Sequence, residues 1–437
     1  MEWQFAILIV VGGSLFLMML GLPVAFCLLA VDIIGVYLWW GGVAGLEQLT
    51  TSIRDGVGSF ILLPIPLFIL MGEIMYHANI VPNLLNSLDK WIGRLPGRLS
   101  LLAVGGGTLL GTLTGVTMGS VALMGSTMVP EMEKRGYQKS MVLGPVGSIG
   151  VLAAMIPPSI LGVLIAGLAQ ISIGRVLIGI IIPGLLISAL FSAYIILRCT
   201  FQPSIAPPYD VPHSTVAEKV ISFIHYVLPI GFIIFLVIGL IFLGVATPSE
   251  AAATGVIGCI IIALIYGHLN WKVVKKSCWG CLQISIMVLM VIAAARAFGQ
   301  VLAFSGANAG LVKFATDLNL SPMSMLIMMQ AVVLVGGCIM DIVALIMLLI
   351  PMYMPIVKAF GFNEVWFAVV LLLSTTIGAV SPPFGLDLFA LKGTVGPHNK
   401  LGDIYKAVLP FIVLDLVVVM LMIAFPQLVL WLPDLMR

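Results

Sequence analysis

Two proline pairs, Pro157-Pro158 and Pro382-Pro383, interrupt long apolar stretches of the sequence. Proline has no amide hydrogen, so each one leaves a carbonyl group earlier in the helix without its donor. Carbonyl groups freed in this way can coordinate Na⁺, and the N-terminal end of the helix that restarts attracts a carboxylate or sulfonate. One such pair alone is often a structural kink. Two pairs in corresponding places predict a transport site built from discontinuous helices.

Small and hydroxyl-bearing residues mark two further apolar segments, each of which precedes a proline pair. Segment 99–130 contains the run Gly111-Thr112-Leu113-Thr114-Gly115-Val116-Thr117, and segment 322–354 contains Gly336-Gly337 and Asp341. Glycine and threonine suit a helix that stops inside a membrane, where exposed backbone and hydroxyl groups line a site. Asp341 would supply one negative charge to offset the desolvation of a cation.

We therefore expect two Na⁺ sites related by symmetry. One lies between residues 112–117 and the helix break at Pro157-Pro158, which we call the first break. The other lies between residues 337–341 and the helix break at Pro382-Pro383, the second break. Residues 112–117 and 337–341 are called the tips of their segments. The predicted Na⁺ ligands are Thr112, Thr114, Gly115, Gly150, Pro157, Gly337, Asp341, Gly378 and Ser381. The predicted substrate-binding residues are Thr114, Thr117, Ser159, Arg296 and Asp387. Arg296 and Glu73 lie within apolar runs, where a charge is costly and is either paired inside the bundle or functional.

The composition places these segments in a lipid bilayer. Only 9% of the 437 residues are charged and 61% are hydrophobic, whereas soluble domains carry about 25% charged residues. This excludes a soluble enzyme, a nucleic-acid binder and a disordered chain. The five histidines are scattered, and the sequence has no Walker A, HExxH or GxSxG motif. We therefore expect neither an enzyme nor an organic cofactor.

Landmark residues recur at a spacing of 225 positions. Pro23 aligns with Pro248, Gly136 aligns with Gly361, and the first proline pair aligns with the second. Collinear landmarks at one spacing predict a duplicated fold.

Lysine and arginine residues give the two halves opposite orientations. Loops 79–98 and 131–140 are basic, and their second-half equivalents hold one lysine each. Loop 41–59 holds one arginine, and its equivalent, 267–281, holds three lysines. Because basic residues collect in cytoplasmic loops, this swapped bias predicts an inverted repeat.

The hairpin prediction for segment 99–130 follows from its length and its flanks. Basic loops lie on both sides, so both ends face the cytoplasm. Its 32 residues are too few for two crossings, which need about 40. We expect a re-entrant helical hairpin here, and a second one over 322–354 that enters from the opposite face.

The predicted fold is an all-α polytopic membrane protein with ten crossings and two re-entrant hairpins. The first inverted repeat is 1–198, a cytoplasmic linker is 199–221, and the second repeat is 222–437. The broken helices are expected over 141–171 and 366–391. The other crossings are expected over 5–20, 24–40, 60–78, 176–198, 228–245, 249–266, 282–303 and 406–430. Both termini are expected on the periplasmic face.

In this order the motifs resemble the large membrane subunit, or M subunit, of the tripartite ATP-independent periplasmic (TRAP) transporters. The resemblance covers nearly the whole chain. Its motifs include Gly21-Leu22-Pro23, Pro66 to Glu73, Pro130-Glu131-Met132, Ile156-Pro157-Pro158-Ser159, Thr247-Pro248-Ser249-Glu250, Met340-Asp341 and Pro382-Pro383-Phe384-Gly385.

The resemblance implies a Na⁺-driven, elevator-type importer of small organic acid anions in the bacterial inner membrane. It implies two kinds of partner: a periplasmic substrate-binding protein and a small four-helix membrane subunit, the Q subunit. The family often has Ser-Gly-Ser-Ser at the first tip, whereas this chain has Thr114-Gly115-Val116-Thr117 and lacks one hydroxyl. Arg296 and Asp387 are not expected from the family pattern, so they are candidates for tuning substrate choice.

Other functions remain open at this point. A stand-alone Na⁺/dicarboxylate symporter of the same architecture would need no binding protein. A channel is disfavoured because paired hairpins from opposite faces suit alternating access. An intramembrane enzyme would need a nucleophile–base pair or a metal cluster at depth. The sequence does not distinguish a sugar acid, a dicarboxylate, a keto acid and a sulfonate as substrates.

Overall fold

The computed structural model describes residues 3–78, 80–93, 95–114, 117–207 and 215–436, with the side chains at 81–82, 110 and 112–114 left out. Every regular element in these ranges is helical. The prediction of an all-helical polytopic membrane protein is therefore confirmed, and the helices form two groups.

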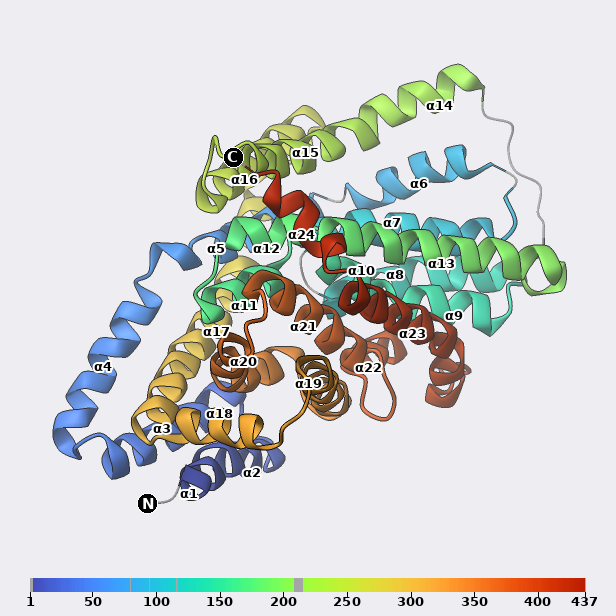
Figure 1. Cartoon of the computed structure of the whole chain (residues 1–437). Coiled ribbons are helices and arrows are strands. Elements are labelled where there is room, and N and C mark those ends of the chain that lie inside the picture. Colours follow the sequence, from blue (N-terminus) through green and yellow to red (C-terminus); the bar gives the residue numbers. More distant parts are fainter. Residues whose placement is uncertain (1–2, 79, 94, 115–116, 208–214, 437) are drawn as a thin grey trace.

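One group, the frame helices, comes from two separate stretches of the chain. The frame helices are α1 (Trp3–Ile7), η1 (Leu8–Gly12), α2 (Gly13–Met19), α3 (Val24–Trp39), α4 (Val43–Val57), η2 (Phe60–Leu62), α5 (Pro64–His77), α6 (Val81–Ile92), α14 (Val216–Ser222), η4 (Phe223–Val227), α15 (Leu228–Phe242), α16 (Pro248–Ile265), α17 (Trp271–Phe304) and α18 (Ala307–Asp317). The long helix α17 contacts α3, α4 and α5 and so connects much of this group (Figure 1).

The other group, the core helices, contains both predicted hairpins and both proline pairs. The core helices are α7 (Arg98–Thr114), α8 (Thr117–Lys134), α9 (Lys139–Gly147), α10 (Ile149–Met155), α11 (Ile160–Ala169), α12 (Ile173–Gly179), α13 (Ile181–Phe201), η3 (Pro203–Ile205), α19 (Pro322–Gly337), α20 (Ile342–Ala359), α21 (Glu364–Ala379), α22 (Leu386–Thr394), α23 (Leu401–Ala424) and α24 (Gln427–Asp434). They touch the frame mainly where α7 meets α5 and α6, and where α20 meets α17 and α18.

Fewer helices are long enough to cross a membrane than the ten that the sequence predicts. Within the described residues, seven helices pass by length and composition, or eight if the bent pair Lys139–Met155 and Ile160–Ala169 counts as one span. The segments predicted over 5–20, 24–40 and 366–391 give apolar helices of at most 17 residues. The residues that follow two of these helices explain where they end. Gly41 and Gly42 adopt positive φ after α3, and Pro382 and Pro383, which follow α21, have no N–H with which to extend it.

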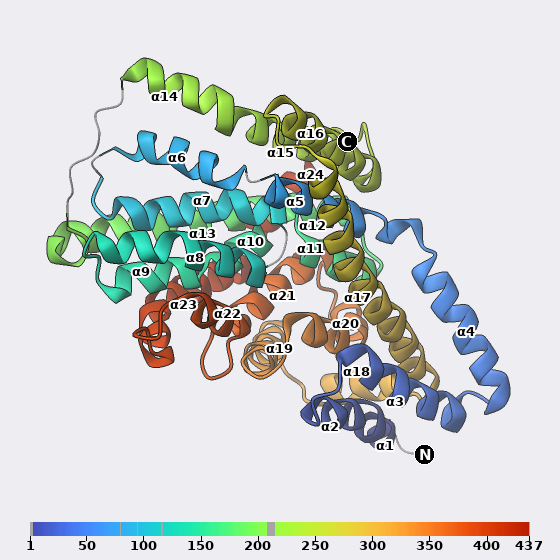
Figure 2. The ribbon, with the colours of Figure 1, turned by 180° about the vertical axis from the view of Figure 1, so that it is seen from behind.

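Three segments expected as loops contain helices. Loop 41–59 contains α4, loop 79–98 contains α6, and the second-half counterpart of loop 79–98, residues 304–321, contains α18. Each is amphipathic or short, so a search for long apolar runs passes over it. Figures 1 and 2 show α4 standing away from the core helices, joined to the rest along α17. The predicted linker 199–221 is also partly helical, because α13 continues to Phe201 and α14 begins at Val216.

The predicted hairpins and broken helices fall on matching sets of core helices. Segment 99–130 becomes α7 and α8, and segment 322–354 becomes α19 and α20. Gly136 follows α8 with φ +77°, and its counterpart Gly361 follows α20 with φ +71°. Only glycine adopts this left-handed conformation easily, so both hairpins end in the same backbone turn.

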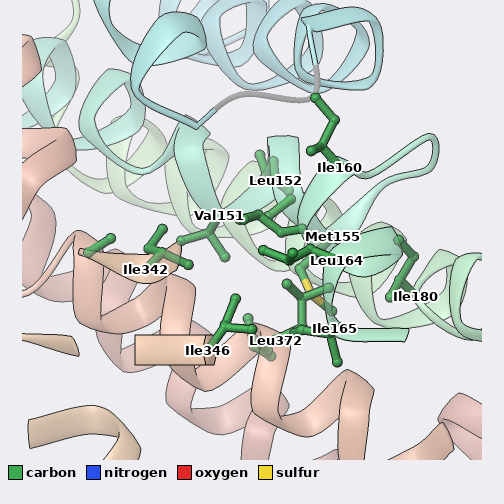
Figure 3. Close-up of a cluster of buried hydrophobic side chains, with 14 of the residues drawn as sticks. Val151, Leu152, Met155, Ile160, Leu164, Ile165, Ile180, Ile342, Ile346 and Leu372 are labelled. Carbon is green, nitrogen blue, oxygen red and sulfur yellow. The ribbon is translucent and has the colours of Figure 1, made fainter. Parts of the chain in front are cut away.

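The core helices of the two halves are interleaved. Helix α8 of the first hairpin packs against α22, which follows the second break, and α20 of the second hairpin packs against α11, which follows the first break. Between them α10 contacts α21. Figure 3 shows buried apolar side chains of this junction, including Val151, Leu164, Ile346 and Leu372. The site residues are therefore held by an apolar, interdigitated core.

Candidate functional site

Three predicted site residues from separate helices, Thr117, Gly150 and Asp387, lie in direct contact. The Thr117 hydroxyl donates to Oδ1 of Asp387 at 3.0 Å. Asp387 Oδ2 lies directly against Gly150, so closely that a Cβ at position 150 would overlap it. Asp387 is 1% exposed. Three helices, α8, α10 and α22, thus meet at one carboxylate, and residues predicted for a Na⁺ site and for substrate binding lie in the same place.

The second junction is a close crossing of Gly337 and Gly378. A Cβ at Gly378 would lie 2.5 Å from the Gly337 Cα, and a Cβ at Gly337 would lie 2.8 Å from the Gly378 Cα. In the first half, Gly111 approaches the backbone of Ala153 in the same close way. Each hairpin therefore packs backbone to backbone on the helix that precedes a proline pair, which brings carbonyl groups close to the break.

Asp341 is the N-cap of α20. Its Oδ2 accepts hydrogen bonds from the backbone N–H groups of Val343 at 2.9 Å and Ala344 at 3.3 Å. An N-cap satisfies amide groups that the first helical turn leaves free. Asp341 also lines a cavity of about 470 Å³ between the second hairpin and the end of α2, where Leu15 and Met18 form part of the apolar wall.

The two breaks offer oxygen ligands that fit Na⁺. Pro157 and Pro158 have no N–H to donate to the carbonyl groups of Ala153 and Ala154. Ser159, which is fully buried, caps α11 by accepting from the Gly162 N–H at 3.1 Å. In the second break the Ser381 hydroxyl donates to the Ile377 carbonyl at 2.7 Å. Neutral oxygens of this kind are the ligands that broken helices provide to Na⁺ in transporters.

Some predicted site residues are not part of these junctions. Gly115 lies outside the described residues, and so do the side chains of Thr112 and Thr114. Arg296 lies on the frame helix α17, where its aliphatic stem packs against Gly56 of α4. It does not join the other predicted substrate residues, and its role as a substrate ligand stays a prediction.

A cavity of about 390 Å³ separates the first hairpin and α22 from the frame helices α5 and α17. Its polar wall includes Glu73 and Tyr76 from the frame, and Ser126 and Thr394 from the core. The Glu73 carboxylate lies 3.3 Å from His77 and rests on Gly280. Sequence reasoning singled out Glu73 but missed Ser126 and Thr394, because no local pattern places α8 and α22 opposite α5.

Comparison with known proteins gives one family over most of the chain. The model of the family described as "Tripartite ATP-independent periplasmic transporter, DctM component" matches residues 11–428. The large permease protein of an ectoine/5-hydroxyectoine TRAP transporter from Ruegeria pomeroyi is 29% identical over 424 residues, which cover 96% of each chain. The isethionate TRAP transporter permease protein DctMQ of Oleidesulfovibrio alaskensis is 28% identical over 369 residues, 84% of this chain and 57% of that protein.

A solved structure shares the fold. The YdaH transporter of Alcanivorax borkumensis matches with a TM-score of 0.63 at 16% sequence identity, covering 90% of this chain and 91% of that one. At this identity the likeness concerns the fold alone. It agrees with an all-helical membrane transporter architecture.

Proposed function

Because the chain belongs to the DctM-component family of tripartite ATP-independent periplasmic transporters, we propose that it is the permease subunit of a Na⁺-coupled importer of a small organic acid anion. Membership makes the chain a multi-pass membrane permease of a secondary transporter. The observation that carries the finer proposal is the junction of hairpins and broken helices. There, the buried hydroxyl groups of Thr117 and Ser159 and the buried Asp387 carboxylate lie near proline pairs that have no N–H to donate. This arrangement suits a cation better than an anion alone.

The substrate is proposed to bind beside the cations. Na⁺ bound near the tips would lower the electrostatic cost of an anion at the same depth. The helices α8, α11, α20 and α22 all begin directly after a tip or a break, and helix N-termini favour carboxylate or sulfonate groups. Relatives named for ectoine and isethionate carry different solutes on the same kind of permease, so the identity of the substrate stays open.

The transport step is proposed to be an elevator movement of the core helices against the frame helices. The division into repeats 1–198 and 222–437, with inverted orientation, is part of this proposal and is supported by the matched positions of the two hairpins. The cavity at Glu73 lies between the two groups, where such a movement would change the surfaces in contact. A hairpin on each face would let one gate close as the other opens.

The partners follow from the family. We propose a small membrane subunit and a periplasmic substrate-binding protein, with the permease in the bacterial inner membrane and both termini in the periplasm. Because this chain covers 57% of the DctMQ permease, that relative has room for an additional membrane part.

The proposal predicts uptake that needs three proteins and a sodium gradient. The permease, reconstituted with its small subunit and supplied with its binding protein, should take up solute when Na⁺ is higher outside than inside. A thermal-shift screen of the binding protein identifies the radiolabelled solute, with ectoine and isethionate among the first compounds tested. An equal K⁺ gradient, or internal ATP without Na⁺, should give only background uptake, because the chain has no nucleotide motif.

The controls separate the alternatives. Uptake by this chain without the other two proteins would favour the stand-alone Na⁺/dicarboxylate symporter. Uptake by the three proteins together that does not depend on the Na⁺ gradient would contradict sodium coupling, while the permease assignment would stand.

A further inference from the structure

Asp387 is a buried carboxylate whose two oxygens have different surroundings. Oδ1 accepts the hydrogen bond from Thr117. Oδ2 is fully buried against Gly150 and has no hydrogen-bond donor among the described residues. An ionised carboxylate in such a place is unstable unless a proton or a cation compensates it.

Basic side chains do not provide that compensation in the described part of the chain. None of the ion pairs among the described residues includes Asp387. The one charged side chain that acts electrostatically on Asp387 among the described residues is another acid, Asp341, and two negative charges repel. A cation beside Asp387 would give the carboxylate the partner it lacks and would reduce its repulsion with Asp341.

The residues around Oδ2 belong to three elements that the transport site uses. Thr117 is the first residue of α8, and Gly150 is near the start of α10. Asp387 is the second residue of α22, after the second break. Glycine at position 150 leaves space that any larger residue would fill, and the Asp387 carboxylate occupies that space beside α10.

We propose that Asp387 supplies the negative charge of the first cation site, with the Thr117 hydroxyl as its neighbour. Asp387 is then an ion ligand rather than a substrate ligand. The inference rests on the proposed Na⁺ coupling and adds that the first site is shared between the two halves. A cation there would tie the first hairpin to α22, so ion binding would stabilise the closed position of that hairpin.

The test uses the purified full-length chain in detergent, with thermal unfolding measured against NaCl at constant ionic strength set by choline chloride. In the unsubstituted protein, Na⁺ should raise the unfolding temperature with a definite midpoint concentration. Asp387→Asn keeps the shape and removes the charge, so the Na⁺ midpoint should rise about fivefold or more. Gly150→Ala keeps the charge but displaces the carboxylate, so it should shift the midpoint in the same direction.

Asp32→Asn is the matched control. Asp32 is also fully buried with both oxygens unpartnered among the described residues, but it lies on the frame helix α3. Its substitution should leave the Na⁺ midpoint unchanged.

If Asp387→Asn keeps the original midpoint, or alters only the substrate dependence of uptake, the proposal is overturned. If the unsubstituted protein shows no specific response to Na⁺, the sodium coupling itself fails instead. Should Asp387→Asn not fold, Thr117→Val, which removes only the hydroxyl, is expected to raise the midpoint by a smaller factor, and an unchanged midpoint would count against the site.

Discussion

Gly378→Ala should nearly abolish uptake. The new methyl group would lie 2.5 Å from the Cα and 2.7 Å from the carbonyl carbon of Gly337, and backbone atoms cannot rotate away as a side chain can. Overpacking of this kind costs about 1–3 kcal/mol in an ordinary core, and here it pushes the second hairpin off the break it faces. We expect uptake to fall to roughly a tenth or less, with a lower unfolding temperature.

Gly239→Ala is the control for this change. Gly239 is a helical glycine on α15 with no atom within 4 Å of a Cβ built there. Its replacement should leave uptake intact and raise helix stability slightly, since alanine is the better helix former by about 1 kcal/mol. Normal uptake by Gly378→Ala would show that the hairpin can shift along α21, and would remove the reason for glycine at this crossing.

Asp341→Asn should raise the Na⁺ concentration for half-maximal uptake by about tenfold or more, which corresponds to about 1.4 kcal/mol of binding free energy. Asparagine caps a helix about as well as aspartate, so the hydrogen bonds to Val343 and Ala344 can persist. The substitution therefore removes the charge and little else. Uptake measured over a range of Na⁺ concentrations in the three-component system gives the result.

Asp341→Ala separates the two roles of this residue. It removes the charge and the cap together, and loss of an N-cap costs about 1 kcal/mol of stability. We expect it to lower both the Na⁺ affinity and the unfolding temperature. Unchanged Na⁺ dependence in Asp341→Asn, with a defect only in Asp341→Ala, would make Asp341 purely structural and would place the second Na⁺ site elsewhere.

The sequence was most informative where a local pattern has one physical consequence. Proline pairs end helices because they lack N–H groups, so the breaks at 157–158 and 382–383 were predictable to within a few residues. Glycine-rich tips and the spacing of 225 predicted helical pairs in both halves, and α7–α8 and α19–α20 lie there. The cap role of Asp341 also follows from its position just before an apolar helix.

Long-range contacts were not predictable in this way. Nothing near Asp387 in the sequence indicates that Thr117, 270 positions earlier, would donate to it, because the contact depends on how α22 packs on α8. The sequence predicts Arg296 as a substrate ligand because a charge in an apolar run is usually functional. In the structure it packs on α4, a helix that lies where the sequence predicted only a loop.

The central claim is that the two hairpins enter the membrane from opposite faces. In a chain whose native cysteines have been replaced, single cysteines at Asn86 on α6 and Asp317 at the end of α18 report the two segments that precede the hairpins, and both positions are exposed. Each is treated in intact cells with a thiol reagent that does not cross the membrane. Asp317→Cys should react from outside, and Asn86→Cys should react only after the membrane is permeabilised. Reaction of both from the same face would contradict the inverted repeat and the pairing of the two ion sites.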